Sequence, residues 1–222
     1  MNNDLDVLKR LLEKRYSCRG FLETPVYKTT IEEIVSTAQE VPSWCNSQPW
    51  QLAICSSVET RELATALSAA AEGLHALDIK FPEKYQGVYK ERRSTCGWQL
   101  YDAVGVTKGD RAASNSQVMQ NYQFFGAPHV AIVTTPKELG VYGAVDCGAF
   151  VTAFTLAAQG LGVATIAQAA IAGITPVVRE ILSLSTDRDI LCAISFGYAD
   201  DGYPANQFRT KRATASEVID WH

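Results

Sequence analysis

The sequence predicts an α+β fold in which helices cover a sheet and pack around one long buried helix. Stretches whose apolar residues recur at helical spacing alternate with a handful of short, non-consecutive strands. Residues 145–159 are apolar on nearly every face, so we expect a buried helix at the centre of the core or of a dimer interface. A chain of 222 residues is long enough for one sizeable core, and we expect a single domain over residues 1–222.

The first two helices are placed by apolar spacing and by their end signals. Leucines recur at helical spacing after Asp4, which can serve as N-cap, and predict a helix that runs to about Lys14. Thr30 and Glu33 have the spacing of a capping box, and the helix that they introduce must stop before Pro42.

The middle of the chain mixes regular elements with one irregular excursion. Residues 50–55 alternate apolar and small or polar side chains, which predicts a strand with one buried face. A helix is expected over 58–71. Residues 74–110 form a candidate lid, aromatic, charged and irregular over 81–89. A further helix is expected over 114–124.

The second half of the chain supplies the remaining strands and a tail. Strands are expected over 129–134, 162–166 and 190–197. Thr175, followed by proline, reads as the N-cap of a helix with proline at its first position. Residues 200–222 are extended and polar, and we expect them to form an arm that crosses a surface of this chain or of a partner.

Composition excludes several classes of partner. A net charge of −4 argues against nucleic acid or an anionic membrane surface as the main partner. The N-terminus has no leader-like pattern, and no window approaches 18 uninterrupted apolar residues. The 6 cysteines are scattered without metal-like spacing to the 3 histidines. We therefore expect a cytoplasmic protein with reduced thiols and no metal.

Two basic groups stand out on this acidic chain. Arg15, Ser17 and Arg19 alternate directly after the first helix, and they point the same way only if the segment is extended. Such a fork of donors suits a phosphate or another planar anion. A lone motif of this kind is more often a surface arginine pair at a helix end. A second basic cluster at 209–212 and a polar loop at Asn46 favour the functional interpretation.

Familiar catalytic signatures are missing from the sequence. It contains no HExxH motif, complete GxGxxG fingerprint, P-loop or GxSxG elbow. The sequence therefore offers no zinc site, pyrophosphate-binding turn or serine nucleophile, and its aromatic residues are by default core.

Five motifs in the right order carry a family resemblance. They are Arg15 to Phe21, Pro42-Ser43 with Asn46 to Trp50, Gly160 to Gly162 with 167–169 and 178–180, Asn121 to Pro128, and Ser195 to Tyr198 with Phe208 to Arg212. Each motif alone is weak, but together, over residues 15 to about 215, they resemble the FMN-dependent nitroreductase family and its nitrobenzoate-reductase-like branch.

The resemblance implies which residues hold the FMN phosphate. That group carries roughly −1.5 to −2 charge and needs arginine and hydroxyl donors. By resemblance Arg15, Ser17 and Arg212 would hold it, with Arg209 an additional contact and Tyr16 within the same stretch.

The resemblance also implies contacts to the flavin ring and ribityl chain. Arg19 would lie near N1 and the C2 carbonyl, where a fixed cation favours the reduced ring. Pro42, Ser43 and Asn46 would contribute from the other subunit of a homodimer. The backbone N–H groups of Ala167 and Gln168 would face flavin N5. This makes dimerisation part of the cofactor site.

The implied activity is that of a flavoprotein oxidoreductase. NADH or NADPH would pass hydride to flavin N5, and nitroaromatics, nitrobenzoate among them, or related small aromatic acceptors would then take the electrons by ping-pong kinetics. No side chain need act as a catalytic group. Candidate substrate contacts are Trp44, Tyr85, Tyr122 and Phe124. Tyr85, Arg92 and Arg93 could pair with a substrate carboxylate, although solvated surface charges are the commoner explanation.

Other functions remain open at this point. The same fold could serve a dehalogenase, an azoline-type oxidase or a flavin-fragmenting enzyme. A non-catalytic flavin-binding protein could use the arginine fork to sequester a phosphate ligand. A reactive thiol at Cys45 or Cys18, beside arginines, ranks below these. No ribose-binding signature distinguishes NADH from NADPH.

Overall fold

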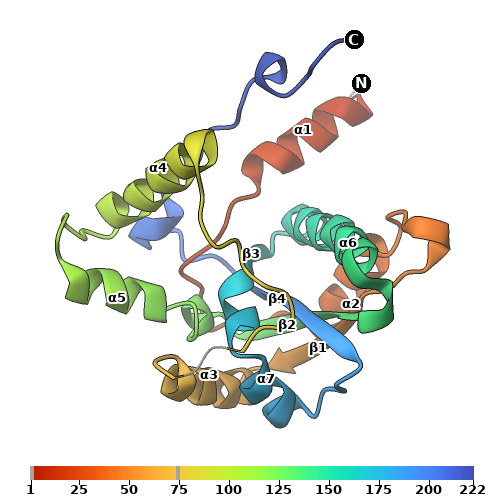
Figure 1. Cartoon of the computed structure of the whole chain (residues 1–222), viewed down its shortest axis with the longest axis horizontal. Coiled ribbons are helices and arrows are strands. Elements are labelled where there is room, and N and C mark those ends of the chain that lie inside the picture. Colours follow the sequence, from red (N-terminus) through yellow and green to blue (C-terminus); the bar gives the residue numbers. More distant parts are fainter. Residues whose placement is uncertain (1–2, 74–75) are drawn as a thin grey trace.

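A four-stranded antiparallel sheet organises the chain, in the order β1-β2-β4-β3 (Figure 1). The computed structural model describes residues 3–73 and 76–222. The strands are β1 (Gln51–Ser56), β2 (His129–Pro136), β3 (Ala164–Gln168) and β4 (Arg188–Gly197). Because β2 and β4 lie in the middle, most of their residues are buried. The predicted α+β class, with an antiparallel sheet, is confirmed.

Helices cover both faces of this sheet (Figure 1). The seven α-helices of the described residues are α1 (Asp4–Lys14), α2 (Lys28–Ala38), α3 (Val58–Ala70), α4 (Gly87–Ala103), α5 (Arg111–Met119), α6 (Gly140–Gly160) and α7 (Thr175–Leu182). One cluster of buried side chains joins the sheet to α2 and α6, and a second joins it to α3 and α7. The sheet is therefore the middle layer of three.

Aromatic contacts fill the layer between the sheet and α6. Phe150, Phe154 and Phe196 are fully buried. The rings of Trp50 and Phe150 stack with centroids 5.1 Å apart, and those of Phe154 and Phe196 meet edge to face at 5.6 Å. Each such pair contributes about 0.5–1.5 kcal/mol of stability beyond the contribution of the apolar area that it buries. This packing fixes α6 against the strands.

Helix α6 is buried on one side only. Its residues Cys147, Phe150 and Phe154 are buried, whereas Val141 and Val145 are 76% and 61% exposed. The expectation of a buried helix over 145–159 therefore holds for the face on the sheet. The stretch Lys137–Gly160 would also be long and apolar enough to cross a membrane by length and composition, which is weak evidence because soluble core helices pass the same test.

Three predicted helix starts are wrong in detail. Asn3, not Asp4, caps α1, and its side chain accepts a hydrogen bond from the Leu5 N–H at 3.2 Å. Helix α2 begins at Lys28, so the expected capping-box pair lies inside the helix. Thr175 is the first residue of α7 and not its N-cap, and its hydroxyl donates to the Ala76 carbonyl at 3.0 Å.

The expected single buried face of the first strand is also wrong. Leu52 packs toward α2 and α6, while Ala53 and Cys55 pack toward α3. Ile54 is 37% exposed. Because helices cover both faces of the sheet, neither face of β1 is wholly exposed to solvent. The alternation of side chains therefore cannot identify a single buried face.

The excursion is more helical than expected. Residues 81–86 are irregular, but helix α4 starts at Gly87 and includes Tyr89. Residues 74 and 75, at the start of the expected excursion, lie outside the described residues. Helix α5 ends at Met119, and the chain then turns through a short 3-10 segment, so the helix expected over 114–124 extends too far.

Both ends of the chain expose apolar side chains. Leu5, Leu8 and Leu12 of α1 are 51%, 46% and 48% exposed, and α1 buries no residue. The tail after β4 contains two short 3-10 turns and no strand, and Trp221 near its end is 86% exposed. The two termini lie at the same end of the molecule (Figure 1).

Candidate functional site

The segment after α1 is extended, as its donor spacing predicts. Arg15 leaves the helix with φ −64° and ψ 129°, and Ser17 forms a parallel bridge with Thr165 of β3. The Cys18 N–H donates to the Thr165 carbonyl at 3.0 Å. The segment thus continues the sheet beyond its edge strand, and its alternate side chains share one side.

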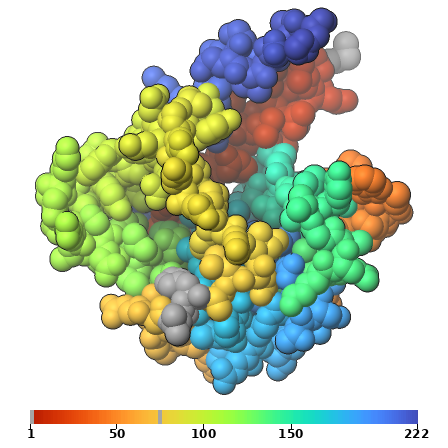
Figure 2. Space-filling model, in the orientation of Figure 1, coloured from red at the N-terminus to blue at the C-terminus, as the bar shows by residue number. Residues whose placement is uncertain are grey.

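That side forms one wall of a cavity of about 590 Å³. The opposite wall comes from the tail. The cavity is lined by Leu12, Glu13, Arg15, Tyr16, Ser17, Arg19, Cys96, Phe208, Arg209, Thr210 and Arg212. Figure 2 shows this part of the surface hollowed beside α4. The structure therefore brings the fork at 15–19 together with Arg209 and Arg212, although the two groups lie almost 200 positions apart, whereas Lys211 does not line the cavity.

The arginines from the two ends of the chain meet without acidic partners. Among the described residues, Arg15, Arg209 and Arg212 form no ion pair with a carboxylate. Burial, and then repulsion from Arg212, lowers the pKa of Arg15. Arg209 stacks over the Tyr16 ring at 3.8 Å, and Arg212 Nη1 donates to the Thr210 hydroxyl at 2.7 Å. The fold therefore holds positively charged guanidinium groups close together, and these groups keep N–H donors that can bind an anion.

Arg19 is positioned deeper in the same cavity. Its backbone N–H donates to Asn206 Oδ1 at 2.8 Å, and its Nη1 donates to the Ser17 carbonyl at 3.2 Å. The guanidinium lies 5.9 Å from the centre of the Phe125 ring. Burial lowers the pKa of Arg19, and it has no acidic partner within the described part of the chain. A half-buried cation of this kind calls for an anionic or electron-rich ligand.

A phosphate ester matches this set of donors. A group of roughly −1.5 to −2 charge would offset the mutual repulsion of the arginines and accept their free N–H donors. Ser17 adds a hydroxyl at the same wall. The residues present therefore fit a ligand that carries a phosphate, as FMN does.

Ala167 and Gln168 lie at the end of the edge strand β3. Ala167 is exposed, and Thr165, two residues before it, is bridged to the segment that carries the arginine fork. The Gln168 side chain is buried and committed to structure, since Nε2 donates to the Asn121 carbonyl at 2.9 Å and Oε1 accepts from the Ser195 hydroxyl. The polar atoms of the Gln168 side chain are therefore already engaged within the protein.

The loop with Pro42, Ser43 and Asn46 does not line the arginine cavity. It packs on α6 instead, where the buried Asp146 carboxylate accepts the Trp44 N–H at 3.1 Å to each oxygen. Three nearby residues, Cys45, Asn46 and Gln48, have left-handed backbone with φ between 46° and 55°. The loop therefore has a defined backbone shape and does not contribute to the chain's own arginine cavity.

The expected substrate contacts separate into exposed and core residues. Trp44 is 56% exposed and meets the Tyr142 ring at 4.2 Å. Tyr85 is also exposed and lies 5.5 Å from the Arg93 guanidinium. Tyr122 and Phe124 are 7% and 0% exposed and belong to the core cluster under α3, so their burial gives a substrate role no support.

The positions of Cys18 and Cys45 do not support a reactive thiol in the arginine cavity. Burial raises the pKa of Cys18, whose Sγ donates to the Gly20 carbonyl at 3.1 Å. It is therefore a neutral, satisfied thiol and no nucleophile. Cys45 is exposed in the loop that packs on α6, away from the arginine cavity.

Two site residues were missed by the sequence reasoning. Cys96 of α4 lines the arginine cavity. Asn206 is 3% exposed, and besides accepting from Arg19 it donates to the Gly20 and Asp200 carbonyls at 2.9 and 2.8 Å. It ties the tail to the fork segment.

The sequence of this chain matches a known protein family and several characterised proteins. The model described as the Nitroreductase family matches residues 12–198. The nitroreductase NfnB of Mycolicibacterium smegmatis is 34% identical over 95% of this chain and 90% of its own. A 4-nitrobenzoate reductase of Nocardioides sp. is 30% identical over 98% and 89%.

Solved structures agree with these matches. The crystal structure of FMN-dependent nitroreductase NfnB from Mycobacterium smegmatis in complex with NADPH superposes with a TM-score of 0.94 at 32% identity, covering 99% of this chain and 100% of that one. An FMN- and NADPH-dependent nitroreductase NfnB from Sphigopyxis sp. strain HMH gives 0.92 at 28% identity, covering 96% and 98%.

Proposed function

Because this chain belongs to the nitroreductase family, we propose that it is an FMN-dependent, NAD(P)H-consuming oxidoreductase that reduces nitroaromatic compounds, nitrobenzoate among them. The observation that carries the proposal is the convergence of Arg15, Arg19, Arg209 and Arg212 on one cavity without a carboxylate partner within the described residues. Relatives named as nitroreductase and 4-nitrobenzoate reductase support the choice of substrate class.

The role that we propose for the chain's own residues is to bind FMN and to orient its ring. Arg15, Ser17 and Arg212, with Arg209, would hold the FMN phosphate, and Arg19 would lie at the edge of the ring where a cation favours its reduced form. When bound, FMN supplies the two-electron hydride chemistry. The backbone N–H groups at Ala167 and Gln168 would serve the ring as donors. No side chain needs to act as nucleophile or general base.

We further propose that the active form is a homodimer with shared flavin sites. The exposed leucines of α1 and the exposed apolar face of α6 suit burial against a second copy. The shaped loop with Pro42, Ser43 and Asn46 would then reach the partner's site. Residues 200–222 would act as an arm across the dimer. The six cysteines are all free thiols, which supports a cytoplasmic location.

A direct test uses the purified protein loaded with FMN. We expect a yellow protein whose flavin absorption is bleached by NADPH or NADH without oxygen and restored by 4-nitrobenzoate or nitrobenzene. A protein that binds FMN but is reduced only by dithionite would instead indicate flavin sequestration. A protein that does not bind FMN would refute the proposal.

Shared sites can be tested by mixing subunits. A dimer of one Arg15→Ala chain and one Asp146→Ala chain would contain one site with both defects and one intact site, if the loop acts across the interface. We expect half of the flavin sites to keep wild-type affinity. If the loop served its own chain, both sites would be defective, and no wild-type affinity would be measured.

A further inference from the structure

A second cavity, of about 340 Å³, lies between α6, β4, the turn after β3 and the segment 79–81. Its volume is in the range of small-molecule sites. Its walls are almost entirely aliphatic or aromatic, with Ile79 and Phe81 on one side, Val151 of α6 on another and Leu191 of β4 on a third. Such a slot suits a planar apolar ring.

Lys80 is the exception in this slot. Among the described residues that line it, Lys80 is the only basic side chain and none is acidic. Cys147 and Cys192 also line the slot, but burial raises their pKa values to about 11 and about 12, so both thiols are neutral near pH 7. Within residues 3–73 and 76–222, Lys80 forms no ion pair. The slot therefore offers one uncommitted positive charge at its rim.

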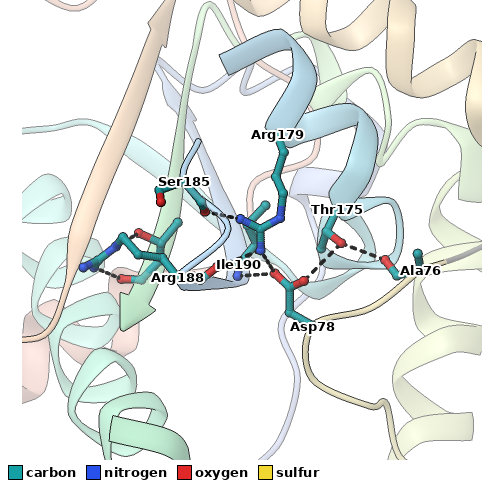
Figure 3. Close-up of polar contacts among 8 residues, drawn as sticks. Ala76, Asp78, Thr175, Arg179, Ser185, Arg188 and Ile190 are labelled. Carbon is teal, nitrogen blue, oxygen red and sulfur yellow. Dashed lines mark hydrogen bonds and ion pairs between the residues drawn. The ribbon is translucent and has the colours of Figure 1, made fainter. Parts of the chain in front are cut away.

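The segment that carries Lys80 is fixed from behind by a buried ion pair. Figure 3 shows Asp78 paired with Arg179 of α7, while the Ile190 N–H donates to Asp78 Oδ2 at 2.7 Å. The two side chains of the pair are only 12% and 14% exposed. Arg179 also donates to the Arg188 carbonyl at 2.7 Å. Because Asp78 is already neutralised by Arg179, Lys80 is left free for a ligand.

A backbone contact adds to this attachment. The Ala76 N–H donates to the Gly173 carbonyl at 3.0 Å. The Thr175 hydroxyl donates to the Ala76 carbonyl at 3.0 Å, as Figure 3 shows. Residues 76–78 are thereby held to the turn between β3 and α7. The wall formed by 79–81 follows directly from this anchored stretch.

The slot adjoins the strand end that we assign to the flavin ring. Ala169, which lines the slot, directly follows Gln168. We propose that this slot receives the aromatic ring of the acceptor and that Lys80 selects acceptors bearing a carboxylate. This inference rests on the proposed function and deepens it, because it names a nitrobenzoate-like acid as the preferred class and one residue as the determinant of that preference.

Benzoate and its neutral analogue benzamide are suitable unreactive probes. Their dissociation constants for the FMN-loaded protein can be measured by calorimetry for the wild type, Lys80→Gln and Lys80→Arg. We expect the wild type to prefer benzoate and Lys80→Gln to lower that preference about 5- to 20-fold, between the worth of an exposed ion pair and that of a charge-assisted hydrogen bond. Lys80→Arg should keep most of the preference.

Lys84 provides the matched control. It is an exposed lysine on the same segment and does not line the slot, so Lys84→Gln should leave both dissociation constants unchanged. The preference for benzoate should also weaken at high salt, because the charge lies near solvent. Equal binding of the two probes by the wild type, or an unchanged preference in Lys80→Gln, would overturn the inference.

Turnover separates this inference from the proposed function. The ratio of kcat/KM for 4-nitrobenzoate over nitrobenzene should fall in Lys80→Gln as the binding preference falls. A holoenzyme that reduces both compounds with a ratio insensitive to Lys80 would refute the inference and leave the function standing. A holoenzyme that reduces neither would refute the function, while the benzoate measurement would still decide whether Lys80 binds a carboxylate.

Discussion

Replacing Arg15 by alanine tests whether the two ends of the chain form an anion site. The Arg15 guanidinium is half-buried, has no acidic partner among the described residues and is repelled by Arg212. Its removal should weaken FMN binding by about 1.5–3 kcal/mol, the worth of a charge-assisted hydrogen bond, or roughly 10- to 150-fold in dissociation constant. Partial exposure of the side chain favours the lower half of that range.

The same replacement should behave differently in the flavin-free protein. A residue that only stabilised the fold would lower the melting temperature when removed. Loss of Arg15 instead relieves a repulsion, so we expect the melting temperature of the apoprotein to be unchanged or slightly higher. Arg10→Ala, on the exposed surface of α1, is the matched control and should change neither quantity.

Quenching of FMN fluorescence on titration with apoprotein gives the dissociation constant, and a thermal scan gives the melting temperature. A dissociation constant for Arg15→Ala within twofold of the wild type would refute the phosphate role. A melting temperature that falls by several degrees in the apoprotein would show that Arg15 is structural, whatever happens to FMN.

Three further substitutions test other parts of the structure. Asp78→Asn removes one charge of the buried pair with Arg179, and we expect the free energy of unfolding to fall by about 3–5 kcal/mol in urea titrations; no loss would contradict a stabilising pair. Burial lowers the pKa of His129 below 6.5, so the unfolded chain binds more protons, and the free energy of unfolding should fall as pH drops below about 6.5. His129→Gln should flatten that dependence, and an equally steep curve would reject this cause. Asp146→Asn keeps one acceptor for the Trp44 N–H, and we expect FMN to bind about 3- to 10-fold more weakly in an intact dimer; unchanged binding would separate the loop from the flavin site.

Local patterns could predict the fork but not its surroundings. The alternate placement of Arg15, Ser17 and Arg19 requires an extended chain if the side chains are to converge, and this is the conformation found. Nothing local to Asn206 indicates that its side chain donates to the Gly20 carbonyl, because that contact spans 186 positions along the chain. The same holds for Cys96, which a helix brings to the cavity from a region that the sequence described only as an excursion.

The sequence pattern did not predict which faces of α6 and β1 are buried, because the two faces of each element differ in ways that the pattern does not record. Helix α6 reads as apolar throughout because one face packs on the sheet and the other stays exposed in the single chain, so composition alone could not separate core from interface. The prediction of a single buried face for β1 is wrong because both of its faces are partly covered. The aromatic residues Tyr122 and Phe124 follow the ordinary preference of such side chains for the core.

The arginine cavity joins parts of the chain that other contacts hold only loosely. Helix α1 buries no residue, and the tail beyond residue 207 has no strand pairing. Arg15 belongs to the first of these segments and Arg212 to the second, and their charges repel each other. A phosphate between them would convert that repulsion into two attractions, so flavin binding and the attachment of both chain ends are thermodynamically linked. The same ends carry much of the exposed apolar surface that we propose to be buried in a dimer, so in that dimer cofactor affinity and subunit association would be reciprocal properties of one site.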